Sequence, residues 1–513
     1  MKKATGRANA VIASALLACC LAAAAACSSS DGSSTPSIDD ELVPGTAEIM
    51  GWAEEIVAQG IRRPGYPADD WIEGWARDHF VALGLEEVTL DPVEVDRWEP
   101  LRWSLTVWHP ETPNETLTIP CYAVPFSGNT SPDGVTGELE VFSTPEGEEP
   151  EDLTGKIAIV ENEFLALPQS VMRALFARWE YDPEGAFDNL VQTLPFSGAF
   201  QDAMGPSIEA GAIGFLGILR GLPWETDQYY VPYDALERPI PGAWLSSSNG
   251  DRLLQFLEEG PAEGRLVLER DLQKATSHNV TGVLRGASDE WIIIGSHHDG
   301  PWASAVEDAS GVALVLAQAK YWSQVPQRKR PHNLMFLLNG GHMSGGAGLH
   351  HFVNTNRAFL ERDVVVEVHL EHAAREARGE DGRLVPTDAP EVRWWFTSFM
   401  PPLEEAVADA ICAEELGRSF LMPVEGFPPG SMNPPTDAAF FHPWSPIVSF
   451  LTAPMYLFDA QDTIDKIHEP SLVPLTRAAI RIINDMHDES AASLRSTLYV
   501  PPRTETLAPC SER

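Results

Sequence analysis

The feature that most constrains the fold is an alternation of apolar runs with helix-type patterns in the second half of the chain. Short apolar runs occur at 291–294, 333–338 and 364–370, and helix-type spacing of apolar residues lies between them, at 312–322 and 345–353. Parallel strands need such crossover helices, because each strand must start again from the same edge of the sheet. The alternation therefore predicts an α/β fold with a mixed, mostly parallel central sheet flanked by helices.

This α/β domain is expected to span 271–490, with a C-terminal tail at 491–513. Its last helix is predicted to begin near Pro474, because apolar residues recur on one helical face. We interpret these residues as core positions: Leu475, Ala479, Ile482 and Met486.

The residues before this domain fall into two parts. Helical apolar spacing at 48–59 and 71–83, separated by the turn-forming RRPGYPADD, predicts a helical lead-in at 46–120. From 121 to 270 the pattern changes to short β-like runs with many Gly and Pro residues, such as GKIAIV and GAIGFLGIL. The change predicts a separate, inserted β-rich module.

Residues 1–27 have the pattern of an export signal. A basic start precedes an apolar stretch that ends at Cys27, and a flexible linker follows at 28–45. Bacterial lipoprotein signals have this form, with a lipid attached to the cysteine. We therefore expect an exported protein that is anchored to the cell envelope through Cys27.

Two alternatives to this assignment remain at the sequence level. Ala24 stands where the lipoprotein pattern prefers a larger aliphatic residue, so Cys19 or Cys20 is a second candidate for lipidation. A transmembrane anchor is the other interpretation of the stretch, but the apolar run is short. No later segment is long and apolar enough to cross a bilayer.

Charge and cysteine content exclude several classes of protein. The chain has 75 acidic and 35 basic residues, a formal charge of −40 that is spread along the sequence. Nucleic acid is not an expected partner, since phosphate binding needs a basic surface. Beyond the signal only Cys121, Cys412 and Cys510 remain. Such an odd, widely spaced set predicts neither a disulfide framework nor a zinc finger.

Candidate metal ligands follow three successive predicted strands. GSHHDG at 295–300 places His297 and Asp299 after the first strand, while NGGH at 339–342 and HLEH at 369–372 end the next two. The carboxyl ends of parallel strands meet at one edge of a sheet, which is where ligands bind in such folds. A single histidine would be an ordinary loop residue. Imidazole and carboxylate groups after three consecutive strands instead indicate a zinc site.

Longer segments around these residues resemble a known family. NVTGVLRGASDEWIIIGSHHDG and EDASGVALVLAQA are similar to the core of the di-zinc aminopeptidases, whose relatives include glutamate carboxypeptidase II and the glutaminyl cyclases. Upstream, GKIAIV, EAGAIGFLG and PIPGAWLSSSNGDRLL resemble the protease-associated domain inserted in that family. The resemblance implies an α/β sandwich with co-catalytic zinc ions that cleaves N-terminal residues from peptides.

A comparison by position implies a partly conserved set of metal ligands. His297 matches the first zinc ligand, and Asp299 matches the acid that orients it. Glu307 stands at the aspartate that bridges the two metals, with Asp308 after it as the nearest substitute. Glu371 stands at a further aspartate ligand. Both glutamates keep the charge of the family's residue and lengthen its side chain.

Three other positions depart from the family. Gly341 stands at the glutamate that serves as general base, and His342 stands at a zinc-ligating glutamate. Phe458 replaces the last zinc histidine and has Asp459 beside it, while Asp437 matches a family aspartate. General-base assistance is worth about two to four orders of magnitude in rate. His342 or His298 is the expected substitute for the base, because imidazole titrates near neutral pH.

The resemblance thus implies one zinc ion more readily than two, held by His297, Glu307 and Glu371 with His342 assisting. Asp299 and His342 are the expected catalytic side chains. We expect an exported, membrane-tethered metallohydrolase that releases N-terminal residues from peptides. Two alternatives stay open: a catalytically inactive homologue that binds a peptide or scaffolds a partner, and an acyl transfer like that of glutaminyl cyclases.

Overall fold

A computed structural model describes residues 37–143, 152–198, 200–426, 434–499 and 506–513. The predicted signal at 1–27, with Cys27, lies outside the described residues, as does the first half of the linker, 28–36. Residues 38–513 form one compact unit. None of the described helices is long and apolar enough to span a membrane.

The α/β part is built on the predicted sheet. Strands β11 (Trp291–His297), β12 (Asn333–Asn339), β13 (Val364–Leu370) and β18 (Ile447–Thr452) pair in parallel in the order β12-β11-β13-β18. On one side, β10 (Glu263–Leu284) pairs antiparallel with β12; on the other, β16 (Arg393–Thr397) pairs antiparallel with β18 and parallel with β17 (Ser419–Pro423). The predicted mixed, mostly parallel α/β sheet is confirmed.

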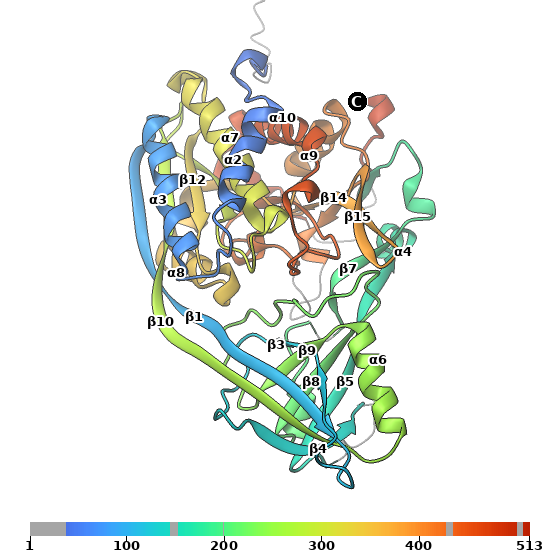
Figure 1. Ribbon diagram of the computed structural model, residues 1–513. Coiled ribbons are helices and arrows are strands. Elements are labelled where there is room, and N and C mark those ends of the chain that lie inside the picture. The colour runs from blue at the N-terminus through green and yellow to red at the C-terminus, as the bar shows by residue number, and fades with distance from the viewer. Residues whose placement is uncertain (1–36, 144–151, 199, 427–433, 500–505) are drawn as a thin grey trace, which may run out of the picture. The chain divides into compact units, whose positions relative to one another are not determined.

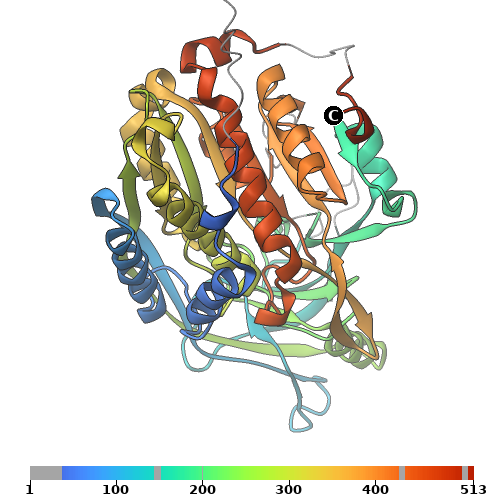
Figure 2. The ribbon, with the colours of Figure 1, turned by 90° about the horizontal axis from the view of Figure 1, so that it is seen from above.

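Helices cover both faces of this sheet because its strands are apolar on both sides. Ile292 and Ile294 of β11 face the core that α7 (Ser310–Gln324) and α10 (Glu469–Asp485) share. Ile293 lies in the opposite core, with apolar residues of α8 (Ala347–Asp363). Helix α10 packs along α9 (Pro401–Ala413), α7 and α2 (Thr46–Val57), as Figure 2 shows. The predicted core face of the last helix, including Leu475 and Ile482, is buried.

The expected helical lead-in at 46–120 is helical only as far as Ala82. After α2 and α3 (Pro67–Ala82) the chain enters the long strand β1 (Glu86–Trp108), which pairs with β10 along most of its length (Figure 1). Apolar residues at every second position, such as Val93 and Val95, or Leu105 and Val107, are buried. This period of two is the signal for a strand, and the sequence expectation had extended the helical pattern past it.

The β-rich region at 121–270 is joined to the sheet through β1 and β10. Its strands β4 (Val135–Val141), β5 (Lys156–Pro168), β8 (Gly214–Arg220) and β9 (Gly242–Leu245) follow β10 in one continuous sheet. They enclose a separate apolar core together with α6 (Ser247–Glu258). The assignment of this region as an inserted protease-associated domain stays a prediction.

A disulfide corrects the expectation drawn from the cysteine count. Cys412 at the end of α9 is bonded to Cys510, with a Cα–Cα distance of 5.3 Å and a sequence separation of 98. The bond attaches the C-terminal end of the chain to α9. Widely spaced cysteines carry no local signal of pairing, so only the fold brings these two together.

We expect Cys412→Ser and Cys510→Ser each to lower the free energy of unfolding by about 2–4 kcal/mol, because the unfolded chain gains conformational freedom. The double variant should lose no more than either single variant, since both remove the same bond. Denaturant unfolding monitored by circular dichroism measures this loss. Cys121→Ser is the control, as Cys121 is a free thiol. Equal stability of the wild type, the two single variants and the double variant would contradict the prediction.

Candidate metal centre

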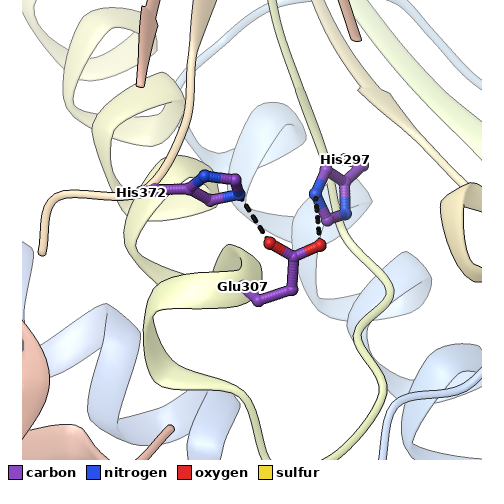
Figure 3. A group of neighbouring side chains, drawn as sticks. All are labelled: His297, Glu307 and His372. Carbon is purple, nitrogen blue, oxygen red and sulfur yellow. Dashed lines mark ion pairs between the residues drawn. The ribbon is translucent and has the colours of Figure 1, made fainter. Parts of the chain in front are cut away.

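Two strand ends and the start of a helix bring His297, Glu307 and His372 together (Figure 3). His297 is the last residue of β11, His372 follows β13, and Glu307 lies just before α7. His297 Nε2 is 3.5 Å from Glu307 Oε1, and His372 Nε2 is 2.6 Å from Glu307 Oε2. All three side chains are buried. We call these three residues the metal group.

Backbone carbonyls fix the orientation of both imidazoles. His297 Nδ1 donates to the carbonyl of Asp299 at 2.9 Å, and His372 Nδ1 donates to the carbonyl of Thr452 at 3.0 Å. Because a carbonyl oxygen only accepts, each Nδ1 must carry a hydrogen. In the neutral rings the lone pair is then on Nε2, which faces the Glu307 carboxylate. Neither Nε2 has a hydrogen-bond partner among the described residues.

This arrangement needs a cation. Two lone pairs and a carboxylate that converge in a buried site repel one another unless a proton or a metal ion lies between them. Two imidazole nitrogens and a carboxylate oxygen are the donors of three-ligand zinc sites. The residues present therefore fit a zinc ion. Without one, His372 has to be protonated: burial lowers its pKa, but the charge and hydrogen bond of Glu307, together with the charges of Asp308 and Glu371, raise the pKa to about 10.

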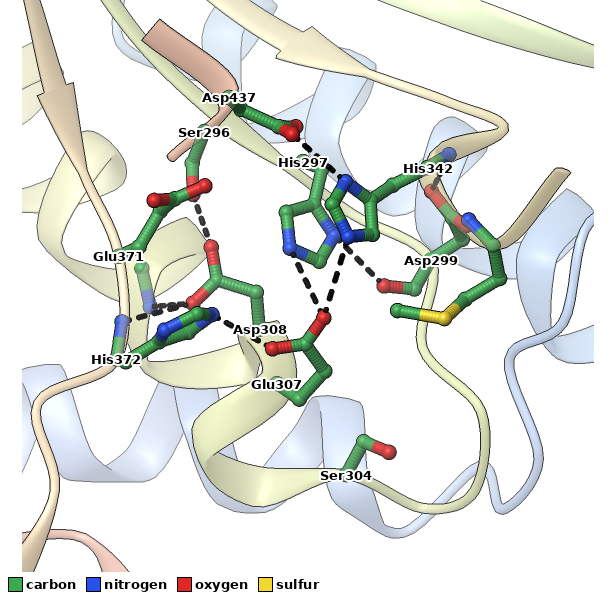
Figure 4. Close-up of polar contacts among 12 residues, drawn as sticks. Ser296, His297, Asp299, Ser304, Glu307, Asp308, His342, Glu371, His372 and Asp437 are labelled. Carbon is green, nitrogen blue, oxygen red and sulfur yellow. Dashed lines mark hydrogen bonds and ion pairs between the residues drawn. The ribbon is translucent and has the colours of Figure 1, made fainter. Parts of the chain in front are cut away.

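His342 adds a fourth side chain to this centre (Figure 4). Its Nε2 lies 3.5 Å from Glu307 Oε1, and its Nδ1 lies 2.8 Å from Asp437 Oδ1. The ring stacks on that of His297 with the centroids 4.1 Å apart. Burial raises the pKa of Asp437, but the neighbouring His342 outweighs burial and lowers it. His297, His342 and Asp437 thus form a second group of convergent donors beside the metal group.

The structure does not place Glu371 in the metal group. Its carboxylate lies beside His369 Nε2, at 3.3 Å, and accepts a hydrogen bond from Thr436 Oγ1 at 3.2 Å. It belongs to a neighbouring set of donors with His369 and Asp437. His372 has a left-handed φ of 51°, and this backbone turn directs the imidazole to Glu307. A sequence pattern does not reveal such a turn. HLEH indicated donors at this strand end, and the assignment of Glu371 as a metal ligand stays a prediction.

Asp299 is close to the centre but acts through other atoms than expected. Its carboxylate accepts from the backbone N–H groups of His342, at 3.0 Å, and Met343, at 2.7 Å. It is the backbone carbonyl of Asp299 that orients His297. The carboxylate therefore holds the turn that carries His342, a positioning role between the first and second strand ends. Asp308 also positions backbone, since it accepts from Gly311 and His372 N–H groups at 3.0 and 3.2 Å.

Gly341, Phe458 and Asp459, where the sequence comparison expects departures from the family, each have defined neighbours. Gly341 has a φ of +74°, and a Cβ added there would lie 2.9 Å from Val95 Cγ1. A side chain there would therefore have to displace the Val95 methyl group and would be strained by the left-handed backbone. Phe458 packs against Tyr233 and Phe200, with ring centroids at 5.2 and 5.7 Å, and offers no ligand atom. Its neighbour Asp459 accepts from Thr226 at 2.6 Å and is not among the convergent donors.

Two charged residues that the sequence did not single out hold the loop between His297 and Glu307. The buried guanidinium of Arg62 donates to three backbone carbonyls, those of His298, Ala303 and Ser304. From the other end of the chain, the Asp462 carboxylate accepts from the N–H groups of Val306 and Glu307, both at 2.9 Å. The RRPG segment includes Arg62 and is recognised as a turn in the sequence. Only the fold shows that the Arg62 guanidinium binds the loop between His297 and Glu307.

A cavity of about 490 Å³ opens beside these groups. Its polar lining includes residues of the centre and its neighbours: Gln201, Asp234, Glu307, His342, Glu371, His372, Thr436, Asp437 and Thr452. The remaining wall is mostly apolar and aromatic, with contributions from the β-rich region and from the loops near β18: Phe196, Phe200, Tyr233, Trp394, Phe440, Leu451, Leu457 and Phe458. The centre thus has a ligand-sized, largely apolar space next to its donors.

The imidazole and carboxylate donors thus gather at the carboxyl ends of the parallel strands, where ligands bind in open α/β sheets. Residues 279–425 match the model of peptidase family M28. No protein of curated function matches the chain in sequence.

Several solved structures have the same fold. An M28 peptidase precursor from Shewanella amazonensis SB2B has 20% identity and a TM-score of 0.65, covering 89% of this chain and 96% of its own. An aminopeptidase from Aneurinibacillus sp. strain AM-1 has 17% identity and a TM-score of 0.59, covering 88% and 96%. A zinc aminopeptidase from Bacillus subtilis has 15% identity and a TM-score of 0.61, covering 88% and 98%. The fold is therefore that of the zinc aminopeptidases.

Replacing Arg62 tests the anchoring of the ligand loop. We expect Arg62→Ala to leave three buried carbonyls without a donor, to lower the free energy of unfolding by about 3 kcal/mol, and to weaken zinc binding about tenfold or more. Zinc affinity is measured by competition with a chromogenic chelator. Arg77→Ala is the matched control, since Arg77 makes an exposed ion pair with Asp78. Unchanged zinc affinity in a folded Arg62→Ala protein would contradict the anchoring role.

Proposed function

We propose that this protein is an exported metallohydrolase of the aminopeptidase type, with one zinc ion held by His297, Glu307 and His372. The observation that carries the proposal is the convergence of two imidazole lone pairs and one carboxylate in a buried site. The M28 match and the fold of zinc aminopeptidases support the reaction class.

The residues of the centre have distinct roles in this proposal. A zinc ion held by the three donors would supply Lewis acidity toward the carbonyl of the bond to be cleaved. His342 holds a proton at Nδ1 toward Asp437, which fixes the ring so that Nε2 faces the metal group. It is the side chain placed to exchange protons with the substrate, since Gly341 has none. Asp299 positions His342 through the backbone.

The substrate is proposed to be a peptide. Glu371 contributes a carboxylate to the cavity wall beside the metal group, where it would pair with an N-terminal amine. The apolar and aromatic wall of the same cavity suits the side chain of the residue to be released. Release of N-terminal residues from peptides is the reaction that this combination supports best.

One observation favours a second candidate, a catalytically inactive homologue that binds a peptide. The general-base position is Gly341, whose surroundings leave no space for a side chain, and Phe458 fills the place of a ligand. The same cavity would then serve binding alone. An acyl transfer like that of glutaminyl cyclases shares the single metal ion and would convert N-terminal glutamine peptides without releasing an amino acid.

Metal content and activity of two variants distinguish these possibilities. We expect about one zinc per chain by plasma mass spectrometry, and hydrolysis of aminoacyl chromogenic substrates that a chelator abolishes and zinc restores. His372→Ala should lose the zinc, and Glu371→Gln should keep it, because only His372 belongs to the metal group. His351→Ala, a histidine at the surface, is the control.

The outcomes separate the candidates. Zinc without turnover on any aminoacyl substrate favours the binding protein. Zinc lost in Glu371→Gln but kept in His372→Ala would refute the proposed ligand set. Gly341→Glu is not expected to raise activity, since its side chain meets Val95 and Ala347.

Export and attachment to the cell envelope through Cys27 form part of the proposal. The pattern of residues 1–27 supports it, and so does the Cys412–Cys510 disulfide, because disulfides persist mainly in oxidising compartments outside the cytoplasm. We expect the wild-type protein to sediment with bacterial membranes and Cys27→Ser to be found in the soluble fraction. Cys121→Ser is the control. Sedimentation of Cys27→Ser together with the wild type would contradict lipidation at this residue.

A further inference from the structure

A second cavity, of about 260 Å³, lies at the start of α10 and shares no residue with the cavity beside the metal group. Two arginines, a histidine and a serine line it: Arg393, Arg418, His468 and Ser471. Its other polar residues are acidic, and Glu184 and Glu415 among them are exposed. We call this space the α10 cavity.

Arg393 is a buried cation without an anionic partner. Arg393 is 5% exposed, and its guanidinium donates to two neutral acceptors, the Gly417 carbonyl and Ser471 Oγ. Among the described residues no carboxylate forms an ion pair with it. Burial and, to a smaller extent, the charge of Arg418 lower the pKa of Arg393 to about 9. A buried charge in this situation is costly unless an anion compensates it.

A second arginine and a histidine lie beside Arg393. Arg418 pairs with Glu376 at 2.9 Å and also lines the cavity. His468 Nε2 donates to the carbonyl of Asp388 at 3.1 Å, and its Nδ1 is 2.6 Å from Ser471 Oγ. Burial lowers the pKa of His468 to about 4, and both arginines contribute to this shift, so the ring is neutral near pH 7. Because acidic side chains also line the cavity, it presents charges of both signs.

We propose that the α10 cavity binds a small carboxylate ligand, whose carboxylate pairs with Arg393. The planar guanidinium presents several N–H groups in one fork, which matches the two oxygens of a carboxylate. The exposed Glu184 and Glu415 favour a ligand that also carries a cationic group, and they oppose a phosphate dianion. Free amino acids have this combination of a carboxylate and an ammonium group. The site does not depend on the proposed hydrolase, because it uses none of the metal group.

Isothermal titration calorimetry of the mature chain tests the site, with metal removed by a chelator and the chelator dialysed away. We expect glycine to bind with a Kd below about 10 mM, and acetate and phosphate to bind more weakly. Arg393→Gln should weaken glycine binding about tenfold or more. Arg362→Gln is the control and should bind as the wild type does, since Arg362 makes an exposed ion pair with Asp363 on another helix.

Three results would overturn the proposal. They are the absence of glycine binding up to about 50 mM, tighter binding of phosphate than of glycine, and undiminished glycine binding in Arg393→Gln. Circular dichroism establishes whether Arg393→Gln folds. If it does not, Arg418→Gln keeps Arg393 and is expected to weaken glycine binding about threefold or more; unchanged binding in that variant also overturns the site. Zinc content and peptide hydrolysis, measured separately, report on the other cavity.

Discussion

The convergence of His297 Nε2, His372 Nε2 and the Glu307 carboxylate is the constraint on which the rest of the functional region depends. Each imidazole is fixed by a backbone carbonyl on the opposite side of its ring, so the direction of its lone pair is set before any ion binds. Such preorganisation removes the entropic cost of gathering the donors at the moment of binding. It also makes a cation necessary, because the buried donors repel one another without it.

This preorganisation is supplied by parts of the chain that are far apart in sequence. Arg62, in the turn before α3, holds the carbonyls of the loop that follows β11, and Asp462, just before α10, holds its N–H groups. Arg62 thus provides donors for the carbonyls of this buried loop, and Asp462 provides acceptors for its N–H groups. Both kinds of backbone group need such partners because the loop is buried away from water. The ligand geometry is therefore a property of the whole α/β unit and not of the strand ends alone.

Close packing surrounds two positions beside the donors. Gly341 occupies a left-handed turn next to Val95 and Ala347, and Phe458 belongs to an aromatic wall. His342 and His372 bring nitrogen donors to the neighbouring space from two different strand ends. The centre therefore combines convergent polar donors with closely packed, largely apolar surroundings.

The sequence by itself determined the sheet and the region of the site. Apolar runs of strand length with helical spacing between them specify a parallel α/β layer, because burial on both faces requires it, and GSHHDG, NGGH and HLEH then fall at one edge. Only the tertiary structure decided which side chains meet. The choice of His372 over Glu371 depends on a single left-handed residue, and the Cys412–Cys510 bond depends on the packing of the chain end against α9. Pattern and spacing fix the order of elements along the chain, whereas the direction of a side chain depends on backbone angles and on contacts with distant residues.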